Sequence, residues 1–254
     1  MSTRFARIGN PRPDMSRRQF NATVLAKGIE MGEHDERNEP SSPACLMHEF
    51  ADELLPRPGG QGPDWAVVQA FRKTKRAELL ARRQAFDRDD RERYAAALIE
   101  RLLATVDLRA FPVLGFYWPI RGELDLRAIA RRHVEAGAAA ALPVVVAKDA
   151  PVEFWQWEPG ASMQRGFWNI PVPSERRVVT PDVLLIPLVG YDGAGYRLGY
   201  GGGYYDRTLA ALGPRPFCVG VAYDDSQLET IHPQPHDIPM NVIVTEQRVL
   251  RFPR

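Results

Sequence analysis

The residue types and spacings that could do chemistry are concentrated in one stretch, GYRLGYGGGYYDR, at positions 195–207. Seven of the chain's 20 glycines fall between Gly190 and Gly203, and a segment with helical character follows. Glycines let backbone N–H groups approach a ligand closely, and a helix N-terminus adds donors and a dipole that favours anions. A plain tight turn explains one or two of these glycines but not the whole run. We therefore expect a phosphate-binding loop.

This loop does not follow the common nucleotide-binding patterns. It contains no lysine, which excludes GxxxxGK[ST], and Tyr204 stands where GxGxxG has its last glycine. Arg197 offers a planar guanidinium that suits phosphate oxygens. Asp206 is a candidate Mg²⁺ ligand beside the phosphates, although capping of the following helix explains it nearly as well.

The elements that must position these residues follow from the hydrophobic pattern. Apolar runs typical of buried strands occupy 113–117, 142–146, 183–188, 217–222 and 242–244, with a further β segment at 152–157. Helices are expected from an N-cap at Asp64 to about residue 80, and at about 89–105, 124–135 and 204–212. This alternation implies a mostly parallel sheet covered on both faces. Ligands bind beyond the carboxyl ends of such strands, and the glycine loop follows one of them.

Length, charge and composition exclude several classes of protein. The 254 residues allow one substantial domain with an appendage, and 44% hydrophobic content is ordinary for a globular protein. A formal net charge of +1 gives no global electrostatic case for nucleic acid or membrane binding. No apolar run approaches the roughly 20 residues of a membrane span. Two cysteines without a CxxC pair predict a reducing, cytoplasmic location.

The first 63 residues differ from the rest of the chain. Repeated proline and glycine clusters predict an N-terminal extension over 1–63 that is largely irregular or disordered. Three early arginines faintly suggest a transit peptide, but an ordinary disordered tail is the preferred interpretation. His48 and Glu49 do not continue into HExxH, because Asp52 occupies the fifth place. The folded body is expected over 64–254.

Several motifs, in the same order along the chain, resemble those of one enzyme family. LIPLVGYD at 185–192 and RLGYGGGYYDR at 197–207 resemble the signature of 5-formyltetrahydrofolate cyclo-ligases, also called methenyltetrahydrofolate synthetases. GELD at 122–125, WNIPVP at 168–173, HDIPM at 236–240 and VTE at 244–246 resemble further motifs of that family. The resemblance covers roughly residues 64–252. It implies a three-layer α/β/α sandwich, NagB/RpiA/CoA-transferase-like, with 64–254 as the cyclo-ligase domain.

The resemblance also implies a reaction. Members of the family convert 5-formyltetrahydrofolate to 5,10-methenyltetrahydrofolate with ATP and Mg²⁺, releasing ADP and phosphate. The formyl oxygen attacks the γ-phosphate, N10 closes the ring, and phosphate leaves. The implied partners are therefore ATP as co-substrate, Mg²⁺ as cofactor and a folate as small-molecule substrate, with no nucleic acid and no membrane. A monomer is expected.

Site roles carry over residue by residue from the resemblance. The implied ATP-binding positions are Arg72, Arg76, Arg197, Leu198, Gly199, Tyr200, Gly201, Gly202, Gly203, Tyr204 and Tyr205. The implied folate-binding positions are Trp118, Glu123, Trp168, Tyr200 and Tyr204, with Glu123 accepting from N–H groups of the pterin. Asp206 and Asp237 are the implied Mg²⁺ carboxylates.

Some of these assignments have simpler alternatives. Lys73 could replace Arg72 as the first phosphate-binding cation, and without the resemblance this basic cluster would be a solvated helix face. Ordinary core packing would explain Trp118 and Trp168. Asn241 departs from the family, in which many members carry aspartate. Its effect on the metal site is open.

Two other functions compete with the cyclo-ligase. The first is a non-catalytic folate- or nucleotide-binding regulator on the same scaffold, which would bind ligands without turnover. The second is an enzyme like the phosphosugar isomerases, which share this broad fold, because fold does not fix function. The two distant aspartates and the WNIP segment argue against the isomerase.

Overall fold

The computed structural model describes residues 64–253. The predicted extension over 1–63, together with Cys45 and the His48–Glu49 pair, lies outside the described residues.

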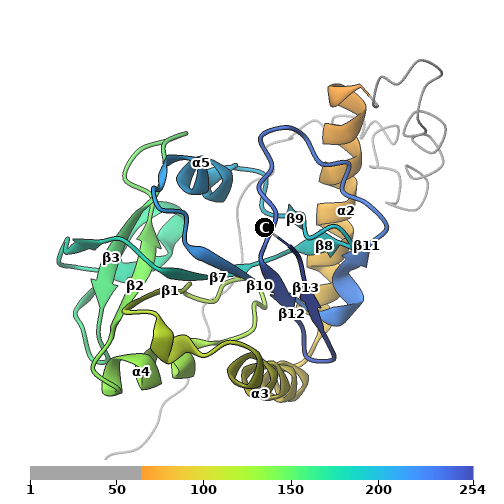
Figure 1. Ribbon diagram of the computed structural model, residues 1–254. Coiled ribbons are helices and arrows are strands. Elements are labelled where there is room, and N and C mark those ends of the chain that lie inside the picture. The colour runs from red at the N-terminus through yellow and green to blue at the C-terminus, as the bar shows by residue number, and fades with distance from the viewer. Residues whose placement is uncertain (1–63, 254) are drawn as a thin grey trace, which may run out of the picture. The chain divides into compact units, whose positions relative to one another are not determined.

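An eight-stranded sheet forms the centre of the described part (Figure 1). Its order is β13-β12-β10-β7-β1-β2-β3-β6. The parallel strands are β12 (Val242–Val244), β10 (Phe217–Val221), β7 (Val183–Pro187), β1 (Val113–Gly115) and β2 (Ala139–Val144). The antiparallel strands at the edges are β13 (Val249–Arg251), β3 (Glu153–Trp157) and β6 (Val178–Val179). The predicted α/β fold with a mostly parallel sheet is confirmed.

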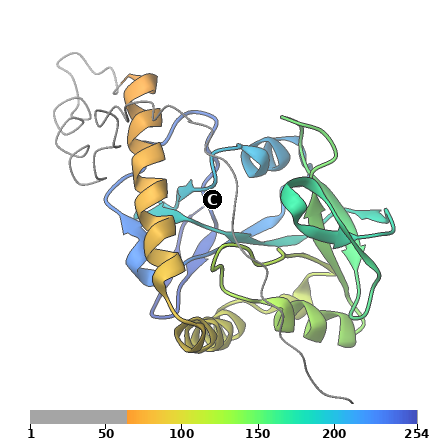
Figure 2. The same ribbon diagram turned by 180° about the vertical axis from the view of Figure 1, so that it is seen from behind.

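Helices lie on both faces of this sheet (Figures 1 and 2). α3 (Arg88–Thr105) and α4 (Arg127–Glu135) cover one face, and α5 (Tyr204–Ala211) covers the other. α2 (Trp65–Ala85) instead packs through Leu79 against a small sheet of β8 (Gly190–Asp192), β9 (Arg197–Leu198) and β11 (Gln227–Leu228). α2 therefore stands beside the loops that leave the central sheet.

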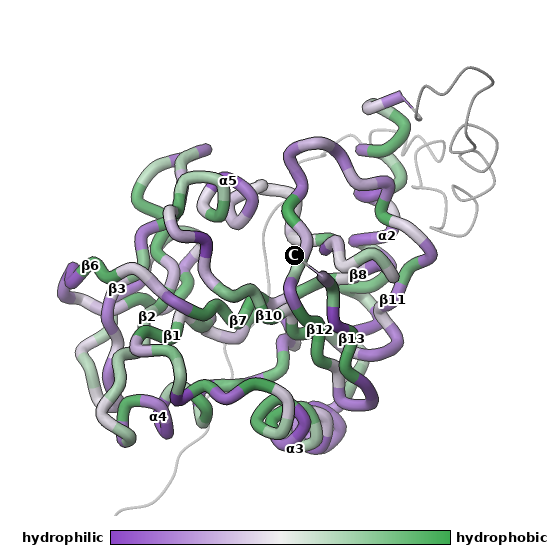
Figure 3. The backbone as a smooth tube through the Cα atoms, viewed as in Figure 1, coloured by the Kyte–Doolittle hydropathy of each residue, from purple (hydrophilic) through white to green (hydrophobic). Residues whose placement is uncertain are grey.

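Alternation along β7 divides the core into two layers. Val183 and Leu185 belong to the cluster under α3 and α4, whereas Leu184 and Ile186 belong to the cluster that includes Leu209 of α5. Successive side chains of a strand point to opposite faces, so a fully apolar strand must be covered on both. Figure 3 shows hydrophobic residues concentrated along the central strands, with hydrophilic residues on the outer helices.

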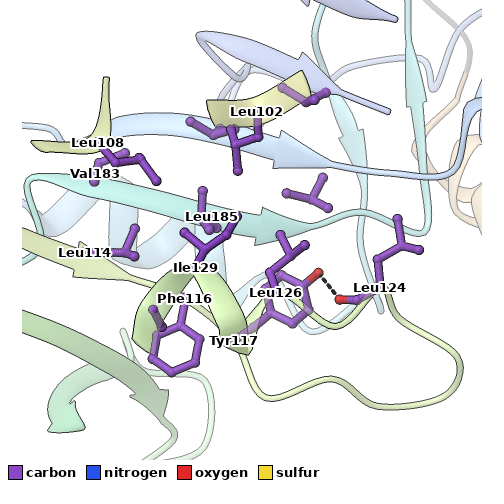
Figure 4. Packing of buried hydrophobic residues seen from close by; sticks show 14 of the residues in the cluster. Leu102, Leu108, Leu114, Phe116, Tyr117, Leu124, Leu126, Ile129, Val183 and Leu185 are labelled. Atoms are coloured by element: carbon purple, nitrogen blue, oxygen red, sulfur yellow. Dashed lines mark hydrogen bonds between the residues drawn. The ribbon is translucent and has the colours of Figure 1, made fainter. Parts of the chain in front are cut away.

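The larger cluster also anchors a loop of functional interest. Leu102 of α3 and Ile129 of α4 pack with Leu185 (Figure 4). The buried Tyr117 donates its hydroxyl to the carbonyl of Leu124 at 2.6 Å. This hydrogen bond closes the loop that follows β1 onto the core, which fixes the loop's conformation.

Helix starts follow capping chemistry. Asp64 caps α2 by accepting from the backbone N–H of Ala66, as predicted, and Asp87 caps α3. α4 begins at Arg127 rather than at the predicted Leu124, because the side chain of Asp125 accepts from the N–H of Arg127 and holds the preceding residues in a turn.

Strand bounds differ from the prediction where alanines and aromatics mislead propensity. β1 ends at Gly115, two residues before the predicted end, and β2 begins at Ala139, three residues before the predicted start. Ala139–Ala141 pair with β1 in the middle of the sheet, where burial outweighs the low strand propensity of alanine. The sequence pattern does not show the two- and three-residue strands, such as β4 (Met163–Arg165) and β5 (Pro171–Pro173), because they are too short for a period of two. The short 3₁₀ helices were likewise not predicted: η1 (Leu108–Ala110), η2 (Phe167–Asn169) and η3 (Asp224–Ser226).

Among the helices of the described part, none combines the length and apolar character that a membrane span requires.

The strand order places a switch point between β1 and β7. β1 is followed in sequence by its neighbour β2, whereas β7 lies on the opposite side of β1. The loops that leave the carboxyl ends of β1 and β7 therefore diverge and open a crevice, which is where ligands bind in such sheets. Glu123 lies on the first of these loops, and the glycine loop follows β7 through β8 and β9.

The packing of α3 yields a test of this core. Leu102 is fully buried, whereas the adjacent Leu103 is 41% exposed. Leu102→Ala is expected to lower the free energy of unfolding by about 2–5 kcal/mol, because it leaves a cavity against the sheet. Leu103→Ala is expected to change it by less than about 1 kcal/mol. Urea unfolding of both variants measures the difference, and equal values would contradict the assigned face of α3.

Candidate active site

The glycine loop connects β9 to α5 and passes close to α2. Gly203 is the N-cap of α5 with φ +64°, and Gly201 has φ +92°. A Cβ on Gly201 would lie 3.2 Å from Cζ of Arg76. At these two positions glycine is required by a left-handed backbone, and at Gly201 by the close approach of a guanidinium as well. The loop is therefore a fixed structure rather than a linker.

Arg76 of α2 is held directly against this loop. Its Nε donates to the carbonyl of Gly199 at 2.6 Å. Burial, followed by the neighbouring charge of Arg72, lowers the pKa of Arg76 from its ordinary value. Two arginines one turn apart on the same helical face concentrate positive charge at the loop. This arrangement is suited to an anion.

Arg72 faces the segment that carries Asp237. Its Nη2 lies 2.6 Å from Oδ2 of Asp237, and its Nε donates to the carbonyl of Ile231. Burial of Asp237 opposes its ionisation, but the hydrogen bonds from Arg72 and from the N–H of Gln234 outweigh burial and lower its pKa. Lys73 is exposed, whereas Arg72 is largely covered. Of the two candidate cations, Arg72 is the one at the site, and the solvated-face interpretation is wrong for it.

Arg197 and Asp206 form a second ion pair beside the first. Nη2 of Arg197 lies 2.6 Å from Oδ1 of Asp206, and its Nη1 donates to the carbonyl of Ile238 at 2.6 Å. Oδ1 of Asp206 also accepts from the N–H of Ile238. The alternative role of Asp206 as a helix cap is wrong, because Gly203 is the N-cap and makes no side-chain cap bond. Asp206 is instead bound to the residue that follows Asp237.

The two predicted metal carboxylates therefore lie on adjacent segments. Within residues 64–253, no group of three or more histidine, cysteine, aspartate or glutamate side chains forms a metal cage. Mg²⁺ in phosphate sites commonly takes one or two carboxylates, with phosphate oxygens and waters completing the octahedron. Asp206 makes both of its contacts through Oδ1. The donor set fits a Mg²⁺–phosphate site better than a site built from protein ligands alone.

Glu123 is buried in a hydrogen-bonded chain with the glycine loop. Its Oε1 accepts from the hydroxyl of Tyr200 at 2.8 Å, and its Oε2 accepts from the N–H of Ile120. Nη2 of Arg83 donates to the same Tyr200 hydroxyl at 2.6 Å. Burial raises the pKa of Glu123 to about 6, and the positive charge of Arg83 opposes this rise. The carboxylate is thus poised to titrate near neutral pH.

Arg83 belongs to the site although it was not predicted. It is 5% exposed, and its Nε also donates to the carbonyl of Arg121 in the loop after β1. The signal was present in the sequence, since Arg83 follows Arg76 by seven residues and Arg72 by eleven. Seven and eleven residues are close to two and three whole helical turns. The three arginines therefore share one face of α2.

Trp168 projects from a backbone of unusual geometry. Trp168 and Asn169 both have left-handed φ values, +53° and +62°. The indole is 63% exposed and meets the ring of Tyr204 edge-on at 5.5 Å. Core packing is therefore the wrong explanation for Trp168. Strained, exposed aromatic residues of this kind are found at ligand sites.

Trp118 lies on the other side of Glu123, at a large pocket. The guanidinium of Arg127 stands over its ring at 4.7 Å, and the tryptophan is half-buried against the core cluster. The pocket has a volume of about 920 Å³ and extends between α3, α4 and the connection from β3 to β4. Glu123 forms part of its wall.

The remaining predicted residues are placed by the same elements. Leu198 is buried among apolar residues that include Leu79, and Tyr205 packs against the core cluster that includes Leu209. These two side chains face the protein interior, so the loop's backbone carries any contact they make with a ligand. Oδ1 of Asn241 accepts from the N–H of Cys218 at 2.7 Å, a bond that joins β10 to the start of β12.

One continuous set of contacts thus joins residues that are far apart in the sequence. It runs from Arg72 and Asp237 to Asp206 and Arg197, and from Arg76 through the glycine loop to Tyr200 and Glu123. Trp168 joins it through Tyr204, and Trp118 shares the pocket wall with Glu123.

Comparison with known proteins gives one consistent result. The sequence pattern of the 5-formyltetrahydrofolate cyclo-ligase family matches residues 68–246. The 5-formyltetrahydrofolate cyclo-ligase of Mycolicibacterium smegmatis is 31% identical over 140 residues, which cover 52% of this chain and 72% of the relative. The enzyme of the same name from Escherichia coli K12 is 29% identical over 180 residues, which cover 67% of this chain and 98% of that one.

A solved structure agrees with the sequence relatives. Aquifex aeolicus 5,10-methenyltetrahydrofolate synthetase superposes with a TM-score of 0.63 at 29% identity, over 72% of this chain and 94% of that chain. The matched residues include the switch-point loops, the glycine loop and both aspartates of the site. The chain therefore belongs to the 5-formyltetrahydrofolate cyclo-ligase family.

Proposed function

We propose that this protein converts 5-formyltetrahydrofolate to 5,10-methenyltetrahydrofolate with ATP and Mg²⁺, and that residues 64–254 form the catalytic domain. The observation that supports this most strongly is the continuous set of contacts from the α2 arginines through the glycine loop to Glu123. It joins an anion-binding region to a buried carboxylate at the switch point. An ATP-dependent reaction of a heterocycle needs both.

The phosphate end is assigned to α2 and the glycine loop. Arg72, Arg76 and Arg197 supply positive charge, and the N-terminus of α5 adds backbone donors. Asp206 and Asp237 would hold Mg²⁺, which when bound neutralises negative charge on the phosphates. The arginines now paired with these aspartates are then available to the phosphate oxygens.

The folate end is assigned to the region around Glu123. A carboxylate is an acceptor only, so it suits the N–H groups of a reduced pterin. Tyr200 and Arg83 fix its orientation. Trp168 and Tyr204 offer aromatic walls beside the glycine loop. This arrangement would hold the formyl group next to the phosphate end.

The proposed chemistry then requires mainly positioning and charge stabilisation. The formyl oxygen attacks the γ-phosphorus of ATP, and the bond to ADP breaks. N10 attacks the formyl carbon of the resulting imidate phosphate, N10 loses its proton, and the C–O bond breaks to release phosphate. Phosphorylation converts a poor leaving oxygen into a good one. The arginines and loop N–H groups stabilise the transferred charge.

A direct assay tests this proposal against its competitors. Protein, ATP, Mg²⁺ and 5-formyltetrahydrofolate are expected to give the absorbance of the methenyl product, with one ADP formed per turnover. Binding of ATP and folate without product would favour the non-catalytic regulator. Turnover of a sugar phosphate without ATP would favour an isomerase. Either result would overturn the proposed reaction.

Asp206→Asn tests the metal assignment. The amide keeps the hydrogen-bond acceptor for Ile238 but loses the charge, so kcat/KM is expected to fall by about 100-fold. The Mg²⁺ concentration for half-maximal rate is expected to rise by about 10-fold or more. Asp149→Asn is the matched control, since that carboxylate is 72% exposed and lies across α5 next to Arg207. An unchanged Mg²⁺ dependence in Asp206→Asn would contradict the assignment.

The raised pKa of Glu123 predicts a pH dependence. Burial raises this pKa to about 6, so the carboxyl is protonated below that pH and loses acceptor capacity for pterin N–H groups. We therefore expect kcat/KM to fall as pH decreases through about 6. Glu123→Gln should lower kcat/KM at neutral pH and remove this acidic limb.

Arg83 variants separate Glu123 from other groups that titrate. Arg83→Met removes the charge that opposes the effect of burial, so the acidic limb is expected to move to higher pH. Arg83→Lys keeps a positive charge and should leave the limb closer to that of the wild type. The titration of ATP is the same in all three proteins. An acidic limb at the same pH in Arg83→Met and wild type would rule out Glu123 as its source.

A further inference from the structure

The pocket of about 920 Å³ is not used by the contacts of the phosphate end. Its walls come from α3, from the first turns of α4 and from the connection between β3 and β4. Its size matches that of pockets for drug-sized ligands. It meets the candidate active site at Trp118 and Glu123, which line it. A ligand bound at Glu123 could therefore extend into this pocket.

Charge in the pocket is unevenly compensated. Arg88 is paired with Glu92, and Arg127 with Asp125. Within residues 64–253, Arg91 of α3 and Arg131 of α4 line the pocket and have no acidic partner. Two guanidinium groups facing one cavity from different helices, with no protein carboxylate to pair with, favour a ligand that carries carboxylates.

The pocket also has a flat, apolar part. Trp118, Trp157, Pro159 and Met163 lie in its wall. The planar guanidinium over the Trp118 ring shows that one face of the indole is open to a flat group. An aromatic ring is suited to the same surface.

Burial gives the pocket a direction. Glu123 is 8% exposed, whereas Arg131 is exposed and Arg91 is half-buried. A ligand that entered would therefore have a hydrogen-bond donor group at the buried end, a flat ring in the middle and negative charge toward solvent. The order of groups in 5-formyltetrahydrofolate is the same: a pterin, a benzoyl ring and a glutamate with two carboxylates.

We propose that this pocket binds the benzoylglutamate end of the folate, with Arg91 and Arg131 as its carboxylate-binding residues. This inference rests on the proposed function for the identity of the substrate. The pocket itself is described independently of that function. Arg91 and Arg131 would set the preference for substrates that carry a glutamate tail and would contribute little to the chemical step.

Kinetics with and without the glutamate provide the test. Arg131→Gln is expected to raise KM for 5-formyltetrahydrofolate by about 10-fold with kcat unchanged, because the lost ion pair acts equally in ground and transition states. KM for 5-formyltetrahydropteroate, which lacks the glutamate, should be the same in variant and wild type. Arg91→Gln is expected to behave in the same way. Arg132→Gln is the control, since this exposed α4 residue is outside the pocket wall.

A binding measurement keeps this inference separate from the proposed reaction. p-Aminobenzoylglutamate, followed by saturation-transfer NMR without ATP, should bind the wild type and Arg132→Gln and bind Arg91→Gln and Arg131→Gln more weakly. If the wild type shows no turnover but this pattern holds, the proposed function fails and the pocket assignment stands. Equal binding to all four proteins, no binding to the wild type, or equal losses on both folate substrates would overturn the pocket assignment.

Discussion

The buried carboxylate of Glu123 is the constraint on which the arrangement of the site depends. It lies in the loop after β1, yet it is held by Tyr200 from the glycine loop, which Arg83 of α2 holds in turn. A buried charge is costly unless it is paired and hydrogen-bonded, so the three elements must meet at this point. The same hydrogen bonds set the distance between the phosphate end and the pterin end. Catalysis of a reaction between two ligands depends on that distance.

The two ion pairs near Glu123 have a different role. Buried ion pairs contribute little net stability, because desolvation offsets their attraction. Arg72 with Asp237 and Arg197 with Asp206 are therefore weak evidence for a structural purpose. Under the proposed function they exchange partners without loss, since phosphates take the arginines and Mg²⁺ takes the carboxylates. Every charge is paired before and after ligands bind.

Sequence reasoning found the fold and most residues of this network but not its connections. Apolar strands alternating with helices predicted the parallel sheet, because burial on both faces leaves a clear pattern. Arg83 was missed because a lone arginine late in a helix looks like solvent-exposed charge until its helical phase with Arg72 and Arg76 is considered. The ion pairs and the exposure of Trp168 depend on tertiary contacts and on left-handed backbone that no local pattern encodes. The pocket likewise depends on how α3 and α4 pack.

Charge separation explains why one fold can hold a substrate with negative charge at only one end. The phosphate end is surrounded by arginines from α2, and the pocket presents Arg91 and Arg131 from the opposite face of the sheet. Glu123 lies between these two cationic regions and lines the pocket. A folate bound in the reverse orientation would place its carboxylates against this buried carboxylate, where like charges repel strongly in a low dielectric. Orientation is thus enforced by repulsion as well as by attraction, which brings the formyl group and not the tail to the phosphates.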